Sequence, residues 1–186
     1  MSVCSVADPQ IEFIFRQVDD ALKNELQAFW AMHGDAYRTE MKASTAVGQV
    51  NNRFLNSSQP PLRRQPGAIA RREGGDIIGI IFVFLREVSD ETTLGTHAYF
   101  QRMYIVPEAR NLKLANQLFQ AFLNGFEKAT EHRDHRAKAL MSVNNNPKLK
   151  IAYVRRYFAR LGFRLLGDNK FGNEVWTKKL QTRFFF

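Results

Sequence analysis

The pattern between His97 and Thr130 constrains the fold of this chain more than any other feature. His97–Val106 is predicted to be a strand, and it ends at Pro107. From Leu112 to about Thr130, apolar residues recur at three- and four-residue spacing, which predicts a strongly amphipathic helix. The chain therefore passes from a strand through a short turn into a long helix.

The remaining segments alternate between strand and helix patterns. Before His97 we predict these elements: a strand at Ile11–Val18, a helix from Asp19 or Asp20 to about Met32, a second helix at Asp35–Val47, and a hairpin of Ala68–Glu73 and Ile77–Val88 around two glycines. After Thr130 we predict these: a strand at Ala139–Val143, a helix from Pro147 to Leu161, and strands at Phe163–Leu166 and Glu174–Leu180. Seven strands and four helices make this a mixed α/β chain.

Composition limits the classes of protein. The 186 residues are 45% hydrophobic and 24% charged, which suits one globular domain. The longest apolar run, Ile77–Leu85, has the length of a strand, so we expect no membrane contact. The single cysteine, Cys4, cannot form an internal disulfide, and a reducing, cytoplasmic location is expected. The formal charge of +9 favours a polyanionic partner such as nucleic acid, an acidic protein surface or a phosphate-rich cofactor, and a basic surface without a specific role is the alternative.

The start of the predicted long helix is the candidate binding site. Helix N-termini carry unpaired backbone N–H groups and partial positive charge, so they bind phosphate groups. Arg110 and Lys113 would add full positive charges there. The four histidines do not form a set of metal ligands, and we expect no metal.

The residues Arg110-Asn111-Leu112-Lys113-Leu114-Ala115 after this strand resemble motif A of the GNAT superfamily of acyl-CoA N-acyltransferases. The strand Ala139–Val143, the run Asn144-Asn145-Asn146 and a helix ending in Tyr157-Phe158-Ala159-Arg160-Leu161-Gly162-Phe163 resemble motif B. The resemblance is best over residues 67–180. It implies a single domain over residues 1–186, with a twisted, mostly antiparallel sheet of about seven strands and helices on both faces.

The resemblance also implies where acetyl-CoA would bind. Its pyrophosphate would lie on backbone N–H groups of these residues: Arg110, Asn111, Leu112, Lys113, Leu114, Ala115 and Asn116. The pantetheine arm would pair with Met103, Tyr104 and Ile105, and the Ile105 N–H would donate to the thioester oxygen as an oxyanion forms. Asn146 is expected to contact the cofactor arm, with Asn144 and Asn145 as equal alternatives.

Three departures from the family pattern concern the chemistry. Lys113 replaces the glycine of the phosphate loop, and Phe158 replaces the tyrosine that often acts as the general acid. Tyr157 is then the candidate acid and Tyr153 the alternative. The glutamate that often lies on the fifth strand is missing, with Met141 near that point, and these residues are possible substitutes as the base: Glu87, Glu91, His97 and Gln101.

The resemblance implies transfer of an acetyl group from acetyl-CoA to an amine acceptor by direct attack in a ternary complex. Two alternatives stay open. One is a binding module without turnover that recognises nucleic acid or a protein, and the other is an acetyltransferase acting on an amine carried by RNA or DNA. The terminal Phe184-Phe185-Phe186 leaves contact with a second subunit, as in a homodimer, open as well.

Overall fold

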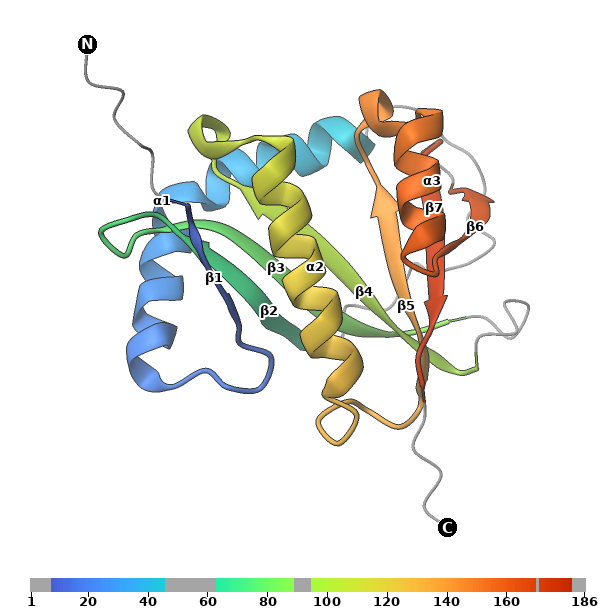
Figure 1. The fold of residues 1–186 in the computed structure, drawn as a ribbon, viewed down its shortest axis with the longest axis horizontal. Coiled ribbons are helices and arrows are strands. Elements are labelled where there is room, and N and C mark those ends of the chain that lie inside the picture. The colour runs from blue at the N-terminus through green and yellow to red at the C-terminus, as the bar shows by residue number, and fades with distance from the viewer. Residues whose placement is uncertain (1–7, 46–62, 89–94, 170, 182–186) are drawn as a thin grey trace. The chain divides into compact units, whose positions relative to one another are not determined.

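The computed structural model describes residues 8–45, 63–88, 95–169 and 171–181 of the chain. Cys4, Glu91 and Phe184–Phe186 lie outside these residues. The elements follow in this order: β1 (Gln10–Phe13), α1 (Asp20–Thr45), β2 (Arg63–Arg71), β3 (Ile77–Glu87), β4 (His97–Ile105), α2 (Leu112–Lys128), β5 (Ala137–Asn144), α3 (Ala152–Arg160), β6 (Arg164–Asp168) and β7 (Glu174–Lys179). Figure 1 labels them along the ribbon. The predicted mixed α/β class is confirmed.

The seven strands form one sheet in the order β1-β2-β3-β4-β5-β7-β6. The strand β1 pairs with β2 in antiparallel orientation, as does β7 with both β5 and β6. The neighbours β4 and β5 are parallel, and their register runs from His97 opposite Ala137 to Gln101 opposite Ser142. The predicted mostly antiparallel sheet of about seven strands is therefore confirmed.

The chain divides into two compact units. Unit one comprises residues 1–34, 65–82 and 103–129, and unit two comprises residues 35–64, 83–102 and 130–186. The strands β2, β3 and β4 and the helix α1 contribute residues to both units. The assignment of the whole chain to a single domain stays a prediction.

Helices cover both faces of the strands in unit one. A Cβ atom added at Gly79 of β3 would lie 3.2 Å from Leu118 of α2. Three residues further along β3, the ring of Phe82 lies 5.9 Å from that of Trp30 in α1. Positions three apart in a strand face opposite sides of a sheet, so α1 and α2 pack on opposite faces.

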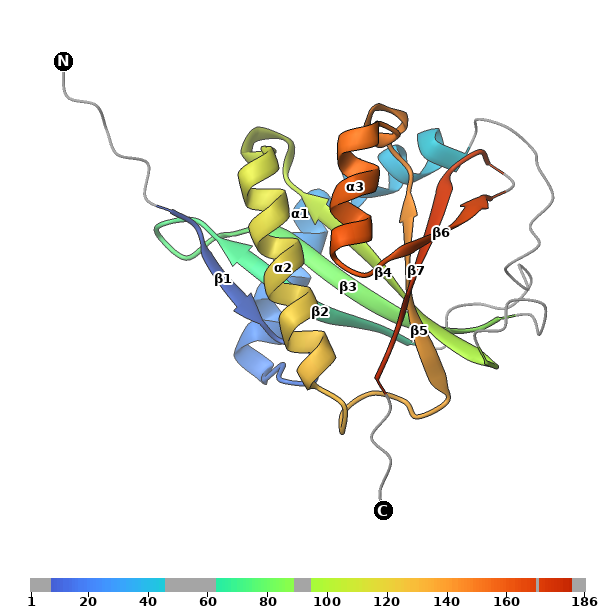
Figure 2. The same cartoon turned by 45° about the vertical axis from the view of Figure 1, so that its right-hand side comes forward.

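The first strand packs against α2, and it is shorter than predicted. Figures 1 and 2 both show β1 beside α2, where the Phe13 ring fills the space that a side chain at position 125 would need. Phe15 is fully buried with its ring 5.0 Å from Phe126. The backbone then turns at Arg16, which has a φ of 64°, a value that extended strands do not adopt. The predicted strand to Val18 is therefore wrong beyond Phe13.

The first helical region is one helix, whereas two were predicted. The Asp19 carboxylate accepts a hydrogen bond of 2.8 Å from the Leu22 N–H, which confirms the predicted capping region. The helix α1 then continues through Gly34. A glycine inside a helix costs about 1 kcal/mol relative to alanine, so packing of its apolar face can maintain the helix through this point. Within the described ranges, no helix has the length and hydropathy that crossing a membrane requires.

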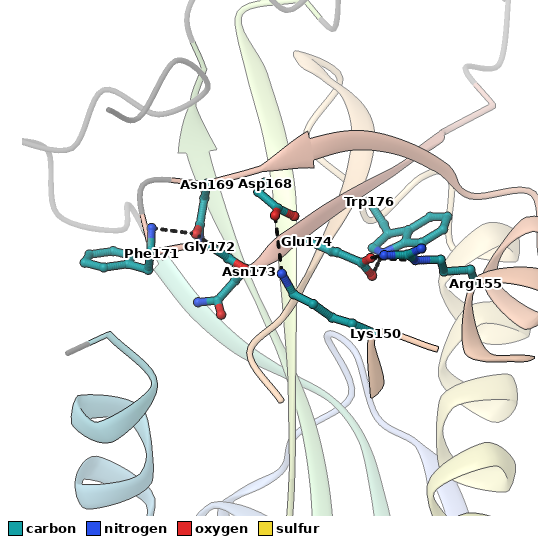
Figure 3. A network of polar contacts seen from close by, with 9 residues as sticks. All are labelled: Lys150, Arg155, Asp168, Asn169, Phe171, Gly172, Asn173, Glu174 and Trp176. Carbon is teal, nitrogen blue, oxygen red and sulfur yellow. Dashed lines mark hydrogen bonds and ion pairs between the residues drawn. The ribbon is translucent and has the colours of Figure 1, made fainter. Parts of the chain in front are cut away.

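Unit two is built around β5, β7, β6 and α3. An aromatic cluster joins the helix to the sheet, because Phe158 of α3 lies 5.2 Å from Trp176 of β7 and 5.3 Å from Phe163, measured between ring centroids. The helix α3 begins at Ala152 and not at the predicted Pro147, which instead starts a separate 3₁₀ turn at Pro147–Leu149. The residues between β6 and β7 form a hydrogen-bonded turn in which Asn169 Oδ1 accepts from two backbone N–H groups (Figure 3).

Candidate functional site

The end of β4 in unit one directs an N–H group away from β3. The Val106 N–H donates a 2.9 Å hydrogen bond to the Ile78 carbonyl of β3. Successive residues of an extended chain point their backbone polar groups to opposite sides, so the N–H and carbonyl of Ile105 point away from β3. The Ile105 carbonyl accepts a 2.8 Å hydrogen bond from Arg110 Nε on this outer side. The direction of the Ile105 N–H is the one that the predicted oxyanion contact requires.

Two side chains near this strand end have structural roles. The Arg110 guanidinium also lies 5.6 Å from the centre of the Tyr104 ring, so Arg110 ties the strand end to the turn that follows it. Tyr104 itself is buried, and its ring lies 6.1 Å from those of Phe29 and Trp30 in α1. Met103 is half-buried. Pairing with a pantetheine arm would use the backbone of Met103, Tyr104 and Ile105, so this packing is compatible with it.

Hydrogen bonds around the first turn of α2 occupy some of the predicted phosphate-binding amides and leave others available. Asn111 is the N-cap, and its Oδ1 accepts a 2.8 Å hydrogen bond from the Leu114 N–H. The Ala115 N–H donates to the Asn111 carbonyl, and the Arg110 N–H donates to the carbonyl of Pro107. For the N–H groups of Asn111, Leu112 and Lys113, the described residues provide no acceptor. These three successive amides are the ones available to a ligand.

The charges around this turn favour an anion. The first turn of α2 contains no acidic residue, so the partial positive charge of the helix start is not offset there. Lys113 forms a 2.6 Å ion pair with Asp8, and both side chains are mostly exposed. An exposed pair of this kind contributes only about 0–1 kcal/mol, so the ammonium group can exchange Asp8 for a bound phosphate at little cost.

In unit two, the structure distinguishes between the candidate asparagines. Asn144, the last residue of β5, is buried, and its Oδ1 accepts a 3.2 Å hydrogen bond from the Asn146 N–H. Its Nδ2 is buried without a hydrogen-bond partner in the part of the chain that the structure describes. Asn146 is exposed. A buried, unpaired amide donor costs about 1–3 kcal/mol, so Asn144 is better suited than Asn146 to donate a hydrogen bond to a ligand carbonyl.

Asn144 belongs to a row of buried polar side chains on one face of β4, β5 and β7. Gln101 Nε2 donates a 2.6 Å hydrogen bond to Ser142 Oγ, and Ser142 shares its face with Asn144 because they are two residues apart. Asn144 lies opposite Glu174 of β7. The polar row therefore consists of Gln101, Ser142, Asn144 and Glu174.

Glu174 is a buried carboxylate that the sequence did not indicate. Its side chain is 2% exposed, and it accepts hydrogen bonds of 2.7 Å from Arg155 Nε and 3.3 Å from Trp176 Nε1 (Figure 3). Arg155 comes from α3, so two elements distant in sequence form this pair. The carboxylate is committed to the guanidinium, which makes Glu174 a structural anchor of α3 and not a free base.

The two candidate tyrosines of α3 differ in environment. Tyr157 is half-buried, with its ring 6.1 Å from that of Phe158 in an edge-on arrangement, whereas Tyr153 is 60% exposed. Phe158 is part of the aromatic cluster with Phe163 and Trp176. Phe158 therefore has a structural role in packing α3 against β7.

The described residues that were predicted as substitutes for the general base are engaged in other contacts or are exposed. Gln101 is bonded to Ser142, and Glu87 is exposed at the end of β3. His97 Nδ1 lies 2.9 Å from Thr96 Oγ1. Among the described residues, no group of three or more histidine, cysteine, aspartate or glutamate side chains could hold a metal ion.

Comparisons with known proteins give structural neighbours only. No protein-family model matches the chain, and no curated protein matches it. A GNAT-superfamily phosphinothricin acetyltransferase from Sinorhizobium meliloti, in complex with acetyl-CoA, is 16% identical over 63% of this chain and 61% of its own, with a TM-score of 0.43. An acetyltransferase of the GNAT family from Streptococcus pneumoniae is 16% identical over 63% of this chain and 67% of its own, with a TM-score of 0.42.

A third neighbour is the KacTA–DNA complex, which is 12% identical over 92% of this chain and 93% of its own, with a TM-score of 0.49. This chain spans 61% of the Sinorhizobium meliloti acetyltransferase, which is less than two thirds of that enzyme's length. The first two neighbours belong to the superfamily that the motifs of this sequence resemble.

Proposed function

We propose that this chain is an N-acetyltransferase that transfers an acetyl group from acetyl-CoA to an amine. The observation that carries the proposal is the junction of β4 and α2. There, three unpaired amides at Asn111–Lys113 lie at the start of α2, which is joined to β4 by a short 3₁₀ turn at Pro107–Ala109. The last N–H of β4, that of Ile105, points away from β3. Amides at a helix start bind pyrophosphate, and a strand-edge N–H can polarise a thioester. The motif A resemblance lies on the same residues.

The reaction needs one nucleophile, one oxyanion donor and two proton transfers. The neutral amine nitrogen attacks the carbonyl carbon of the thioester, and the developing oxyanion accepts a hydrogen bond from the Ile105 N–H. The C–S bond then breaks while the new C–N bond remains. The CoA thiolate takes up one proton, and the nitrogen of the new amide releases one. Tyr157 is the proposed proton donor to the thiolate, with Tyr153 as the alternative. A water molecule is the proposed acceptor of the amine proton.

The cofactor arm is assigned to Asn144 in this proposal, in place of Asn146. The buried Nδ2 of Asn144 has no partner among the described side chains and backbone groups, and an amide carbonyl of pantetheine would satisfy it. The pyrophosphate is assigned to the N–H groups of Asn111, Leu112 and Lys113, with the Lys113 ammonium as a movable counter-charge.

A binding module without turnover is the second candidate. It is favoured by Phe158, which fills the general-acid position with a ring that cannot donate a proton, and by the engagement of Glu174 with Arg155. An acceptor amine carried on RNA or DNA is a variant of the first candidate, and the formal charge of +9 favours it.

Two measurements separate these candidates. Calorimetric titration with acetyl-CoA tests the cofactor site, and release of free thiol in the presence of an amine panel, with and without added RNA, tests turnover. The acetyltransferase is supported by binding together with thiol release. Binding without release for any acceptor favours the module, and the absence of heat with acetyl-CoA refutes the proposed function.

A further inference from the structure

The polar row in unit two contains two unpaired atoms of opposite kind. Gln101 and Asn144 are each 8% exposed. Within the described part of the chain, Gln101 Oε1 has no hydrogen-bond donor and Asn144 Nδ2 has no acceptor. Folded proteins retain few buried polar atoms without a partner, because each one lowers the stability of the fold. The two atoms together indicate a ligand that supplies one donor and one acceptor.

The two side chains lie in a diagonal relation on one face of the sheet. Gln101 of β4 is opposite Ser142 of β5, and Asn144 is two residues further along β5. Residues in this relation have Cα atoms about 8 Å apart. The register of β4 and β5 ends at Gln101 and Ser142, so Asn144 lies two residues beyond the last pair of the two strands. A ligand beside the end of β5 can therefore contact both side chains.

Neighbouring contacts fix which end of each side-chain amide is available. Gln101 Nε2 donates a 2.6 Å hydrogen bond to Ser142 Oγ, which leaves Oε1 as the unpaired end of the Gln101 amide. Asn144 Oδ1 accepts a 3.2 Å hydrogen bond from the Asn146 N–H, which leaves Nδ2 as the unpaired end of the Asn144 amide. One side chain thus offers an acceptor and the other offers a donor.

The neighbouring strand and helix enclose this pair without satisfying it. Glu174 of β7 lies opposite Asn144, but its two carboxylate oxygens accept hydrogen bonds from Arg155 and Trp176. The ring of Trp176 in turn packs 5.2 Å from that of Phe158 in α3, measured between centroids. In an enclosed site of this kind, a ligand that leaves a polar group unpaired binds much more weakly than one that pairs it.

A secondary amide is the group that matches the pair. It has one N–H and one carbonyl, and in a trans amide the two point in opposite directions. With a hydrogen bond of about 2.9 Å at each end, a trans amide spans about 8 Å between its two partner atoms, which is comparable to the separation of the two residues. An ester has no donor for Gln101, and an amine has no carbonyl for Asn144.

We propose that Gln101 and Asn144 together bind one secondary amide of the pantetheine arm of acetyl-CoA. The amide N–H donates to Gln101 Oε1, the amide carbonyl accepts from Asn144 Nδ2, and Ser142 holds Gln101 in the required orientation. This inference rests on the proposed function, which assigns only the carbonyl contact. It adds a requirement for an N–H group in the cofactor arm. Gln101, which was considered as a substitute for the base, is then a positioning residue.

The first part of the test compares two isosteric substitutions by calorimetric titration with acetyl-CoA. Gln101→Met removes the acceptor, and the Kd is expected to rise about tenfold. Thr177→Val is the matched control. Thr177 is 7% exposed, and its Oγ1 also has no partner among the described residues. It follows Trp176 in β7 and therefore faces the opposite side of the sheet, so its substitution is expected to leave the Kd unchanged.

The second part changes the ligand. Two analogues of acetyl-CoA are titrated, and in each of them one amide N–H of the pantetheine arm is replaced by an ester oxygen. The wild type is expected to bind one analogue about tenfold more weakly than acetyl-CoA, which identifies the amide that Gln101 binds. Gln101→Met is expected to bind that analogue and acetyl-CoA equally, because the contact is already lost and the two effects do not add.

The melting temperature distinguishes a binding role from a structural one. Gln101→Met replaces a buried, unpaired carbonyl by an apolar side chain, so the melting temperature without ligand is expected to stay the same or rise. If this variant fails to fold, the titrations of the wild type with the two analogues still test the N–H contact. Ser142→Ala, which keeps both amides and removes the contact that orients Gln101, is then expected to raise the Kd about threefold.

The outcomes separate this inference from the proposed function. Equal binding of acetyl-CoA and both analogues by the wild type would overturn the inference and leave the acetyltransferase intact. A lower melting temperature of Gln101→Met with an unchanged Kd would show a structural role and would also overturn it. A changed KM for the amine with an unchanged Kd for acetyl-CoA would place Gln101 at the acceptor instead. If acetyl-CoA does not bind to the wild type, the proposed function fails and this inference fails with it.

Discussion

Replacement of Leu112 by proline removes one of the three available amides at the start of α2 and is expected to leave the fold intact. Leu112 is the first residue of the helix after the N-cap Asn111, and the residue is 76% exposed. Proline is tolerated at this position, since its missing N–H has no partner within the helix. The preceding Asn111 has φ −151° and ψ 161°, which is the extended conformation that a following proline requires.

The expected magnitude comes from the loss of a single charge-assisted hydrogen bond. An N–H donated to a phosphate oxygen contributes about 1.5–3 kcal/mol, so the Kd for acetyl-CoA is expected to rise about 10- to 150-fold. Leu112→Ala keeps the N–H while it removes the same exposed side chain, so its Kd is expected to match that of the wild type. The melting temperature of Leu112→Pro is expected to be unchanged or slightly higher.

Isothermal titration calorimetry of acetyl-CoA with the wild type and the two variants measures this difference. The comparison between proline and alanine isolates the N–H group, because both variants lack the leucine side chain. Equal Kd values for Leu112→Pro and Leu112→Ala, with both variants folded, would show that the pyrophosphate does not bind these amides. The assignment of the cofactor to the start of α2 would then be wrong.

Three further predictions concern unit two. Arg155→Met leaves the buried carboxylate of Glu174 without its charged partner and is expected to lower the free energy of unfolding by about 3 kcal/mol, measured by urea denaturation. Arg156→Met on the same helix should change this free energy little. Equal effects of the two substitutions would contradict a stabilising ion pair between Arg155 and Glu174. A hydrogen bond from the Arg136 guanidinium lowers the pKa of the Asp134 carboxyl from 3.8 to about 2. The stability advantage of the wild type over Asp134→Asn should therefore be complete above about pH 4 and shrink toward pH 2. A difference in the free energy of unfolding that stays constant over this pH range would contradict the lowered pKa. Tyr157→Phe is expected to lower kcat for thiol release by about 100-fold or more with little change in the Kd for acetyl-CoA, and an unchanged kcat would exclude this tyrosine as the acid.

The elements around α2 could be predicted because their signals are local. The apolar spacing of α2, the end of β4 before Pro107 and the two glycines of the hairpin turn each act within a few residues. The errors arise where packing overrides local preference. Two helices were predicted where α1 is one continuous helix. The alternating pattern predicted a strand to Val18, whereas β1 ends at Phe13 and Phe15 then packs against Phe126.

The candidate site was predicted less completely than the fold, for a related physical reason. The backbone geometry of Ile105 and Leu112 follows from a strand and a helix that the sequence specifies. The partners of Glu174 depend on Arg155, which is 19 residues away, and no spacing rule connects the two. The choice among the three asparagines likewise required burial, because only the structure distinguishes the enclosed Asn144 from the exposed Asn146.

The most direct test of the central claim is a ¹H–¹⁵N correlation spectrum of the chain recorded during titration with acetyl-CoA. Hydrogen bonding to a phosphate or to a thioester oxygen shifts an amide proton downfield. The largest such shifts are predicted for the backbone N–H groups of Asn111, Leu112, Lys113 and Ile105. The other backbone N–H groups are expected to shift less. If these four resonances stay in place at saturating acetyl-CoA, the cofactor does not bind at the β4–α2 junction, and the account of the site is contradicted.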